Sequence, residues 1–211
     1  MAAVTLEGID LAALLCSRVC HDLISPVGAV VNGIEVMEDD ADEQTKIFAL
    51  DLIRKSATTA SARLQFCRIA FGAAGSAGAA IDLGDAEGVA RGMLEDDKTK
   101  LKWGLPRVLL PKNRVKLLLN LLLLGSGTIP RGGNLAIEPI GEGDTMGFKV
   151  TASGLNARIP QAVPGLVAGE TGGNPVDAHA IQPFFTGLLA RTCGMSVTLA
   201  PEGEAIVLTA R

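Results

Sequence analysis

Two long segments with helical apolar periodicity, separated by a short polar break, limit the possible folds more than any other feature of this sequence. In residues 8–38 the apolar positions recur every three or four residues and form one stripe: Cys16, Val19, Leu23, Val27, Val30, Ile34 and Met37. Residues 43–71 carry a heptad seam: Leu50, Ile53, Ala57, Ala60, Leu64, Cys67 and Phe71. The polar break at residues 39–42 predicts that both helices form a hairpin.

The apolar surface of such a hairpin predicts a partner. A lone hairpin leaves much of its stripe in contact with water, and pairing two hairpins into a four-helix bundle buries it. Identical chains pair most simply about a twofold axis. The pattern therefore predicts a homodimer held by a four-helix bundle.

The second half of the chain has a different character. Residues 72–80 are rich in Gly, Ala and Ser and predict a linker, which divides the chain into a hairpin domain at 1–75 and a second domain at 76–211. Within the second domain, the patterns predict three helices and five strands. The helices are 85–94, 112–124 (stopped by Gly125, Gly127 and Pro130) and 178–193, and the strands are 101–105, 135–140, 148–152, 196–200 and 205–210. The fold class is therefore α+β, with helices layered on a sheet.

Composition excludes several functions. The 211 residues carry a net charge of −4 with no basic surplus, and a single Trp and no Tyr offer little for stacking on nucleic acid bases. The most apolar run, residues 115–124, is shorter than the ~20 residues of a membrane helix. The chain shows no signal peptide, and four thinly spread cysteines within apolar patterns predict buried thiols and a reducing, cytoplasmic location.

His21 is the principal candidate for chemistry. It lies two positions after Val19 and two before Leu23, so it is expected opposite the stripe, facing solvent. The same face carries Arg18, Ser25 and Gly28, and Asp22 is adjacent. Small side chains at Ser25 and Gly28 predict an open shelf on which a partner protein docks.

The chemistry available at this face is nucleophilic. A neutral imidazole attacks the phosphorus of an acyl phosphate, Asp22 orients the ring or holds its proton, and Arg18 neutralises phosphoryl oxygens. An ordinary surface histidine is the competing interpretation. A metal site with Cys16 and Cys20 is rejected, because the cysteines are predicted to point inward and His21 outward.

The run His21-Asp22-Leu23-Ile24-Ser25-Pro26 resembles the H-box of sensor histidine kinases. This resemblance implies that His21 is a phosphoacceptor and that Pro26 bends the helix. The second domain resembles the kinases' ATP-binding domain in eroded form. Asn120 stands at the position of the Mg-ATP asparagine, but residues 151–156 lack the adenine-binding aspartate, and residues 181–187 contain one Gly where a glycine-rich lid is expected.

An H-box hairpin followed by a degenerate ATPase-like domain resembles the ChpT-type histidine phosphotransferases of alphaproteobacteria. Residues 70–73 and 129–133 are also similar to that family. The resemblance implies a soluble dimer that passes phosphate from the receiver domain of a hybrid histidine kinase to cell-cycle response regulators. It implies no cofactor of its own, Mg²⁺ in the partner receiver domain, and a vestigial Asn120. Arg158, near the former lid, is either a contact for an acidic receiver face or a solvated surface residue.

Three functions stay open from the sequence: a phosphorelay intermediate that works through His21, a non-catalytic module that binds a regulator, and an ATP-dependent histidine kinase. His179, the only other histidine, is expected to have a structural or surface role. The eroded nucleotide motifs argue against the kinase, and His21 favours the relay over the binding module.

Overall fold

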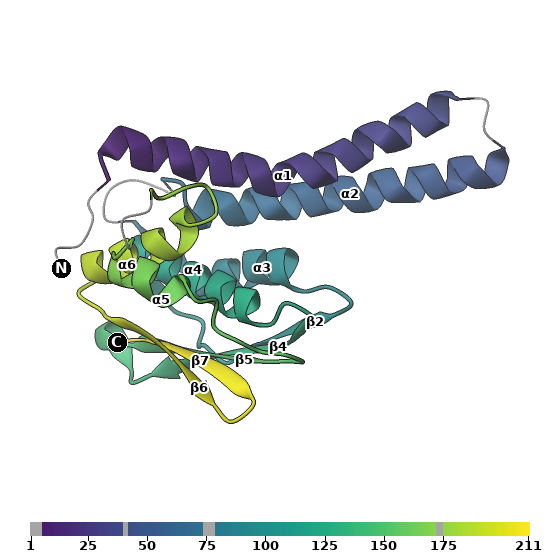
Figure 1. Cartoon of the computed structure of the whole chain (residues 1–211). Coiled ribbons are helices and arrows are strands. Elements are labelled where there is room, and N and C mark those ends of the chain that lie inside the picture. Colours follow the sequence, from purple (N-terminus) through teal and green to yellow (C-terminus); the bar gives the residue numbers. More distant parts are fainter. Residues whose placement is uncertain (1–5, 40–41, 74–78, 172–174) are drawn as a thin grey trace.

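A computed structural model of the chain describes residues 6–39, 42–73, 79–171 and 175–211. The two long helices, α1 (Gly8–Glu38) and α2 (Glu43–Ala70), form the predicted hairpin and extend well beyond the rest of the molecule (Figure 1). Asp42 is the N-cap of α2, and its carboxylate accepts a hydrogen bond from the Thr45 backbone N–H at 2.9 Å. Residues 40–41 of the predicted turn lie outside the described residues.

The face that α1 presents to α2 coincides only in part with the predicted stripe, of which Val19, Leu23 and Val30 are half-buried. Pro26 and Gly33 are the buried residues of α1, and a Cβ at Gly33 would lie 2.6 Å from Ile53 Cγ1. By contrast, Val27 and Ile34 of the predicted stripe remain 50% and 43% exposed. Apolar residues cover a broad arc of α1, and the closest approach of the two helices occurs at a small residue outside the predicted stripe.

The predicted burial of the cysteines is correct for only part of the set. Cys67 is buried and Cys193 is half-buried, but Cys16 and Cys20 are exposed on α1. Cys16 and Cys20 are exposed because they lie on the part of the apolar α1 surface that faces away from α2. By length and composition α1 could cross a membrane, and only 6% of its most apolar window is buried within the chain. Such a single helix is weak evidence for a membrane.

The second domain is built on a five-stranded sheet in the order β2-β4-β5-β7-β6. Only β2 and β4 pair in parallel, and all other pairs are antiparallel. The strands are β2 (Thr99–Trp103), β4 (Gly133–Ile140), β5 (Gly147–Ser153), β6 (Val197–Glu202) and β7 (Ala205–Ala210). All five were predicted. The sequence did not predict the separate antiparallel pair β1 (Ala80–Asp82) and β3 (Leu109–Pro111), or the short 3₁₀ turn Gly143–Thr145.

Helices lie on one face of this sheet, between it and the hairpin (Figure 1). They are α3 (Leu83–Leu94), α4 (Lys112–Thr128), α5 (Val163–Ala168) and α6 (Ile181–Thr192), of which α5 was not predicted. The predicted end of α4 is wrong, since the helix continues through Gly125 and Gly127 to Thr128. A Cβ at Gly125 would lie 2.9 Å from Val150 Cγ1, so this glycine permits close packing of helix on sheet instead of ending the helix.

The base of the hairpin is part of the second domain's core. Phe66, Ile69 and Ala70, at the end of α2, belong to the same buried cluster as the leucines of α4, and Leu11 and Leu15 of α1 pack against it. The predicted boundary at residues 75 and 76 lies outside the described residues and stays a prediction. The two regions therefore share packing where the hairpin is rooted.

Candidate functional site at His21

His21 lies on the exposed side of α1, as its spacing predicts, with 61% of its side chain accessible. Its Nδ1 is 3.5 Å from Asp22 Oδ1, and the other oxygen of the same carboxylate accepts a hydrogen bond from Arg18 Nε at 3.0 Å. Asp22 is only 11% exposed. One half-buried carboxylate thus lies between a guanidinium and the edge of the imidazole, and Arg18 is engaged with Asp22 instead of projecting from the His21 face.

The helix is locally opened beside His21, and a residue of α2 fills the opening. Pro26 lacks the N–H that would bond the carbonyl of Asp22, four positions earlier. Arg63 Nη1 donates to that carbonyl oxygen at 2.7 Å, and α1 bends in its middle part (Figure 1). The sequence interpretation missed Arg63, although Pro26 itself signals a free carbonyl that needs a donor.

The shelf predicted next to His21 is open in the structure. Ser25 is exposed, and a Cβ built on Gly28 would meet nothing within 4 Å. Ile24 beside them is 70% exposed. This face of α1 is therefore accessible to another protein over at least one helical turn beyond the imidazole.

The second domain brings His179 to His21. The two ring centroids are 5.2 Å apart with an interplanar angle of 79°, an edge-to-face pair. His179 lies just before α6, where Asp177 Oδ1 accepts hydrogen bonds from the backbone N–H groups of Ala180 at 2.8 Å and His179 at 2.9 Å. Those hydrogen bonds hold the pKa of the Asp177 carboxyl below its usual range. No local pattern in the sequence connects the two histidines.

Asn120 is fully buried, and its amide is occupied within the protein. Its Nδ2 donates to the carbonyls of Ala70 at 3.1 Å and Lys116 at 2.9 Å, and its Oδ1 accepts from Gln182 Nε2 at 3.1 Å. Gln182 Nε2 also lies 3.1 Å from Thr186 Oγ1. The residue at the position of the Mg-ATP asparagine therefore joins α4 to α2 and α6.

The segment that the resemblance places at the nucleotide lid is helical. Residues 181–187 form the first turns of α6, and a Cβ at Gly187 would overlap the Val167 carbonyl oxygen. The single glycine thus serves close contact with α5. Residues 151–156 run from the end of β5 into a turn in which Asn156 has a φ of 61°.

Arg158 is exposed in the loop between β5 and α5. Its backbone N–H bonds the Thr128 carbonyl at 2.9 Å. Within the described ranges, no hydrogen bond or ion pair joins its side chain to the group around His21. The structure therefore does not bring Arg158 together with the other predicted site residues.

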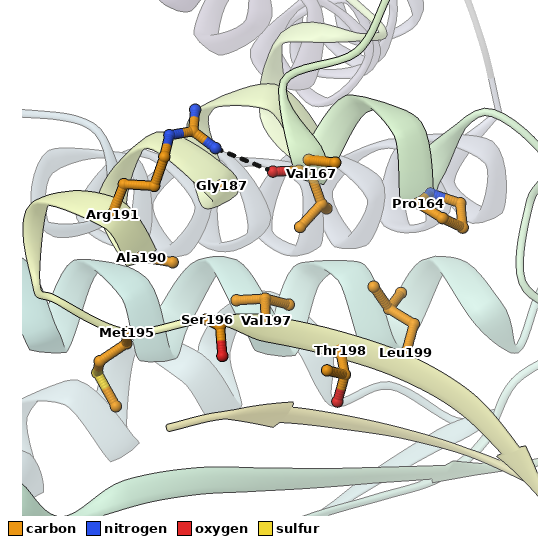
Figure 2. A pocket seen from close by; sticks show the side chains of 11 residues that line it. Pro164, Val167, Gly187, Ala190, Arg191, Met195, Ser196, Val197, Thr198 and Leu199 are labelled. Atoms are coloured by element: carbon orange, nitrogen blue, oxygen red, sulfur yellow. Dashed lines mark hydrogen bonds between the residues drawn. The ribbon is translucent and has the colours of Figure 1, made fainter. Parts of the chain in front are cut away.

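A cavity of about 400 Å³ lies between α5, α6 and β6, away from His21. Figure 2 shows its mostly small and apolar lining and Arg191, whose Nη1 donates to the Val167 carbonyl at 3.2 Å. In the part of the chain that the structure describes, no three His, Cys, Asp or Glu side chains come together as metal ligands. Neither feature adds reactive groups to His21.

Comparison with known proteins assigns the chain to a class. Residues 83–205 match the family model of the histidine phosphotransferase C-terminal domain. The protein phosphotransferase ChpT of Brucella abortus (strain 2308) is 51% identical over 208 residues, which cover 98% of each chain. The chain belongs to the ChpT-type histidine phosphotransferases, and its function is phosphoryl transfer in a phosphorelay.

Solved structures agree with this assignment. A bacterial phosphotransferase determined at 1.7 Å is 48% identical and superposes with a TM-score of 0.90, covering 100% of both chains. The histidine kinase AdeS of Acinetobacter baumannii is more distant, with a TM-score of 0.47 at 12% identity, over 90% of this chain and 95% of that one. The fold that this chain shares with the bacterial phosphotransferase is a helical hairpin followed by an α/β sandwich.

Proposed function

We propose that His21 carries the phosphoryl group in this relay, taking it from a receiver-domain aspartate and giving it to a second one. The observation that carries the proposal is an exposed imidazole whose Nδ1 lies 3.5 Å from the Asp22 carboxylate. A proton on Nδ1 is held by that carboxylate, and the lone pair then lies on Nε2. Asp22 is in this way the orienting residue and His21 the nucleophile.

The transfer step needs no oxidant and no nucleotide. The Nε2 lone pair attacks the phosphorus of an aspartyl phosphate, an N–P bond forms, and the P–O bond to the aspartyl oxygen breaks. The aspartate leaves as a carboxylate with the bonding electrons. The second transfer reverses the step toward another carboxylate. Arg18 lies one helical turn away and is paired with Asp22 through Nε, so we propose that its remaining N–H groups contact the phosphoryl oxygens.

The Mg²⁺ for this chemistry is assigned to the receiver domain. Phosphoryl transfer depends on positioning and on charge neutralisation, which a metal bound to carboxylates supplies. The described residues of this chain offer no such cluster. The chain's own contribution is the nucleophile, its orientation and a docking surface that includes Ser25 and Gly28, with Arg158 proposed as a further contact.

The ATP-dependent kinase is the weaker candidate. The Asn120 amide is bonded to Ala70, Lys116 and Gln182, and residues 151–156 contain no acidic side chain for adenine. Rebuilding a nucleotide site would break buried hydrogen bonds at a cost of ~1–3 kcal/mol for each polar group left unpaired. We therefore propose that the phosphoryl group comes from a partner protein, with no nucleotide cofactor in this chain.

The direct test uses a receiver domain labelled by its own hybrid kinase. The full chain is incubated with this receiver, and the labelled residue is mapped by peptide sequencing. We expect label on His21, none in His21→Gln, and slower but measurable labelling in Asp22→Ala. Transfer by His21→Gln would contradict the proposal, and saturable Mg-ATP binding by calorimetry with label from ATP would favour the kinase.

We also propose that two chains pair through the hairpin. On α1, Ile24, Val27, Val31 and Ile34 are exposed, and Ile47, Leu50 and Leu64 are exposed on α2. These positions recur at heptad spacing, and all except Leu64 belong to the halves of α1 and α2 nearer the hairpin turn, where the hairpin extends beyond the second domain (Figure 1). A second copy supplies a matching surface, since it carries the same stripe.

Sedimentation equilibrium tests the dimer. We expect a dimer for the wild type at micromolar concentration and a monomer for Ile24→Glu combined with Val31→Glu. Leu155→Glu is the control, because Leu155 is 66% exposed but lies in the second domain. A monomeric wild type would contradict the proposal. We propose a cytoplasmic location, which the proposed relay partners and the unpaired cysteines support.

A further inference from the structure

We propose that His179 of the second domain is a positioning residue for the His21 imidazole. The inference rests on the proposed function, because it gives the second domain a part in the transfer step at His21. Its basis is the ring pair that joins the two regions, with centroids 5.2 Å apart at 79°.

The geometry restrains the imidazole from a second side. Aromatic rings in edge-to-face contact attract each other, because the positive edge of one ring meets the negative face of the other. Asp22 Oδ1 lies 3.5 Å from His21 Nδ1, a contact that leaves rotation about the Cβ–Cγ bond only partly restricted. Contact with His179 restricts that rotation further.

The backbone of His179 is held by a hydrogen bond. Its N–H donates to the Asp177 carboxylate, which fixes the turn that precedes α6. The first turns of α6 are anchored by the buried bonds of Gln182 to Asn120 and Thr186. On the other side of the junction, Leu11 and Leu15 of α1 pack against the core of the second domain. Both rings are therefore carried by elements that are packed together.

Fixed orientation is useful only when a large partner brings the phosphoryl group. A docked receiver presents its phosphorus along one direction, so an imidazole already aimed at it reacts without a search over ring orientations. A small phosphodonor approaches from any direction and gains nothing from that restraint. Arg18 and Asp22 flank His21, and Asp177 bonds the His179 backbone; replacing the His179 side chain keeps all three residues.

Two substitutions of His179 distinguish the effect of its aromatic ring from the effect of its ring nitrogens. His179→Ala removes the ring, whereas His179→Phe keeps an edge-to-face partner without a titratable group. His179 is exposed, so neither change removes core packing. Thr192→Ala is the matched control at the far end of α6, where the hydroxyl only bonds Leu188 O.

Single-turnover transfer from the labelled receiver gives the first readout. We expect His179→Ala to lower the rate at saturating receiver roughly three- to tenfold, the size of one aromatic pair, with an unchanged half-saturating concentration. His179→Phe should restore at least half of the rate. With phosphoramidate, where the P–N bond breaks and ammonia leaves as His21 Nε2 bonds the phosphorus, all variants should react equally.

The two histidines of the chain provide a second readout without any phosphodonor. In protein labelled with ¹⁵N at its imidazoles, only two side chains give signals, and His21→Gln assigns them. We expect His179→Ala to shift the His21 ring resonances, whereas Thr192→Ala leaves them in place.

Several outcomes would overturn the inference. They are an unchanged saturating rate in His179→Ala, a rate in His179→Phe as low as in His179→Ala, and a change confined to the half-saturating concentration. An equal loss with phosphoramidate would also overturn it, because His179 would then act on the chemistry itself. Failure of the proposed function is distinguishable, since the wild type itself would then leave His21 unlabelled.

Discussion

The hairpin and the second domain use their apolar residues in opposite ways. In the second domain the leucines of α4, the inner faces of the strands and much of α6 form one buried cluster. Most of the hairpin has no such cluster, and eleven of its large apolar side chains are exposed, among them Ile24, Phe48 and Leu64. His21 lies in the poorly buried region, where a partner has access. Asn120, which the resemblance places at the position of the Mg-ATP asparagine, is buried and hydrogen-bonded within the protein.

The hairpin therefore provides access to His21, whereas the second domain provides tight packing. A phosphoryl acceptor must be exposed to meet another protein, and an exposed helix by itself positions a side chain loosely. Here the tightly packed second domain contacts His21 through His179, and α2 supports the bent turn through Arg63. Substitutions that separate stability from transfer are therefore the best tests of the comparison.

The largest expected effect on stability comes from the core of α4. Leu118→Ala removes a fully buried side chain and leaves a cavity, which should lower the free energy of unfolding by ~2–5 kcal/mol. Ile9→Ala, at an 84% exposed position of α1 outside the proposed dimer surface, should cost far less. Urea denaturation measures both. Equal losses would contradict the difference in packing between the two regions.

The reactivity of Cys67 tests how tightly α2 is packed near His21. Burial, with a smaller effect from the Asp22 charge, raises the pKa of this thiol from 9.0 to about 11. A raised pKa lowers the thiolate fraction, so at pH 8 alkylation should be about 100-fold slower than in the urea-unfolded chain. Mass spectrometry of iodoacetamide-treated protein measures this rate. Cys67 reacting as fast in the folded as in the unfolded chain would contradict the packing described.

Arg63 tests the polar support of the bent turn. Arg63→Met keeps much of the side chain's length but leaves the Asp22 carbonyl without its donor, which should cost ~1–3 kcal/mol of stability. Arg54→Met is the control, because Arg54 is an exposed residue of the same helix. Thermal unfolding gives the comparison. An identical midpoint for both variants would show that the Arg63 hydrogen bond does not stabilise the turn.

Two glycines of α1 give the smallest and most specific contrast. Gly28→Leu projects into open space and should lower receiver-dependent transfer roughly tenfold, about 1.4 kcal/mol, without a change in thermal midpoint. Gly33→Leu is the opposite case, since its Cβ alone would lie 2.6 Å from Ile53, and it should lower the midpoint. Unchanged transfer in Gly28→Leu would move the docking surface elsewhere.

Local patterns predicted the elements well, because each depends on neighbours in the chain. Both hairpin helices, the five sheet strands and the exposure of His21 follow from spacing and from turn residues. The family was also accessible, since the H-box run of residues 21–26 is contiguous. Errors arose where burial decided the outcome: Gly125 continues a helix because a sheet lies against it, and Cys16 is exposed because α2 packs on another face.

The sequence by itself determined the hairpin, the place of His21 on it and the α+β class of the second domain. Only the tertiary structure decided what surrounds His21. From α2, Arg63 donates a hydrogen bond to the carbonyl that Pro26 leaves without a donor. From the second domain, His179 contacts the His21 imidazole. Neither contact has a local signature, because each depends on how packed elements meet in space and not on the spacing of residues along one of them.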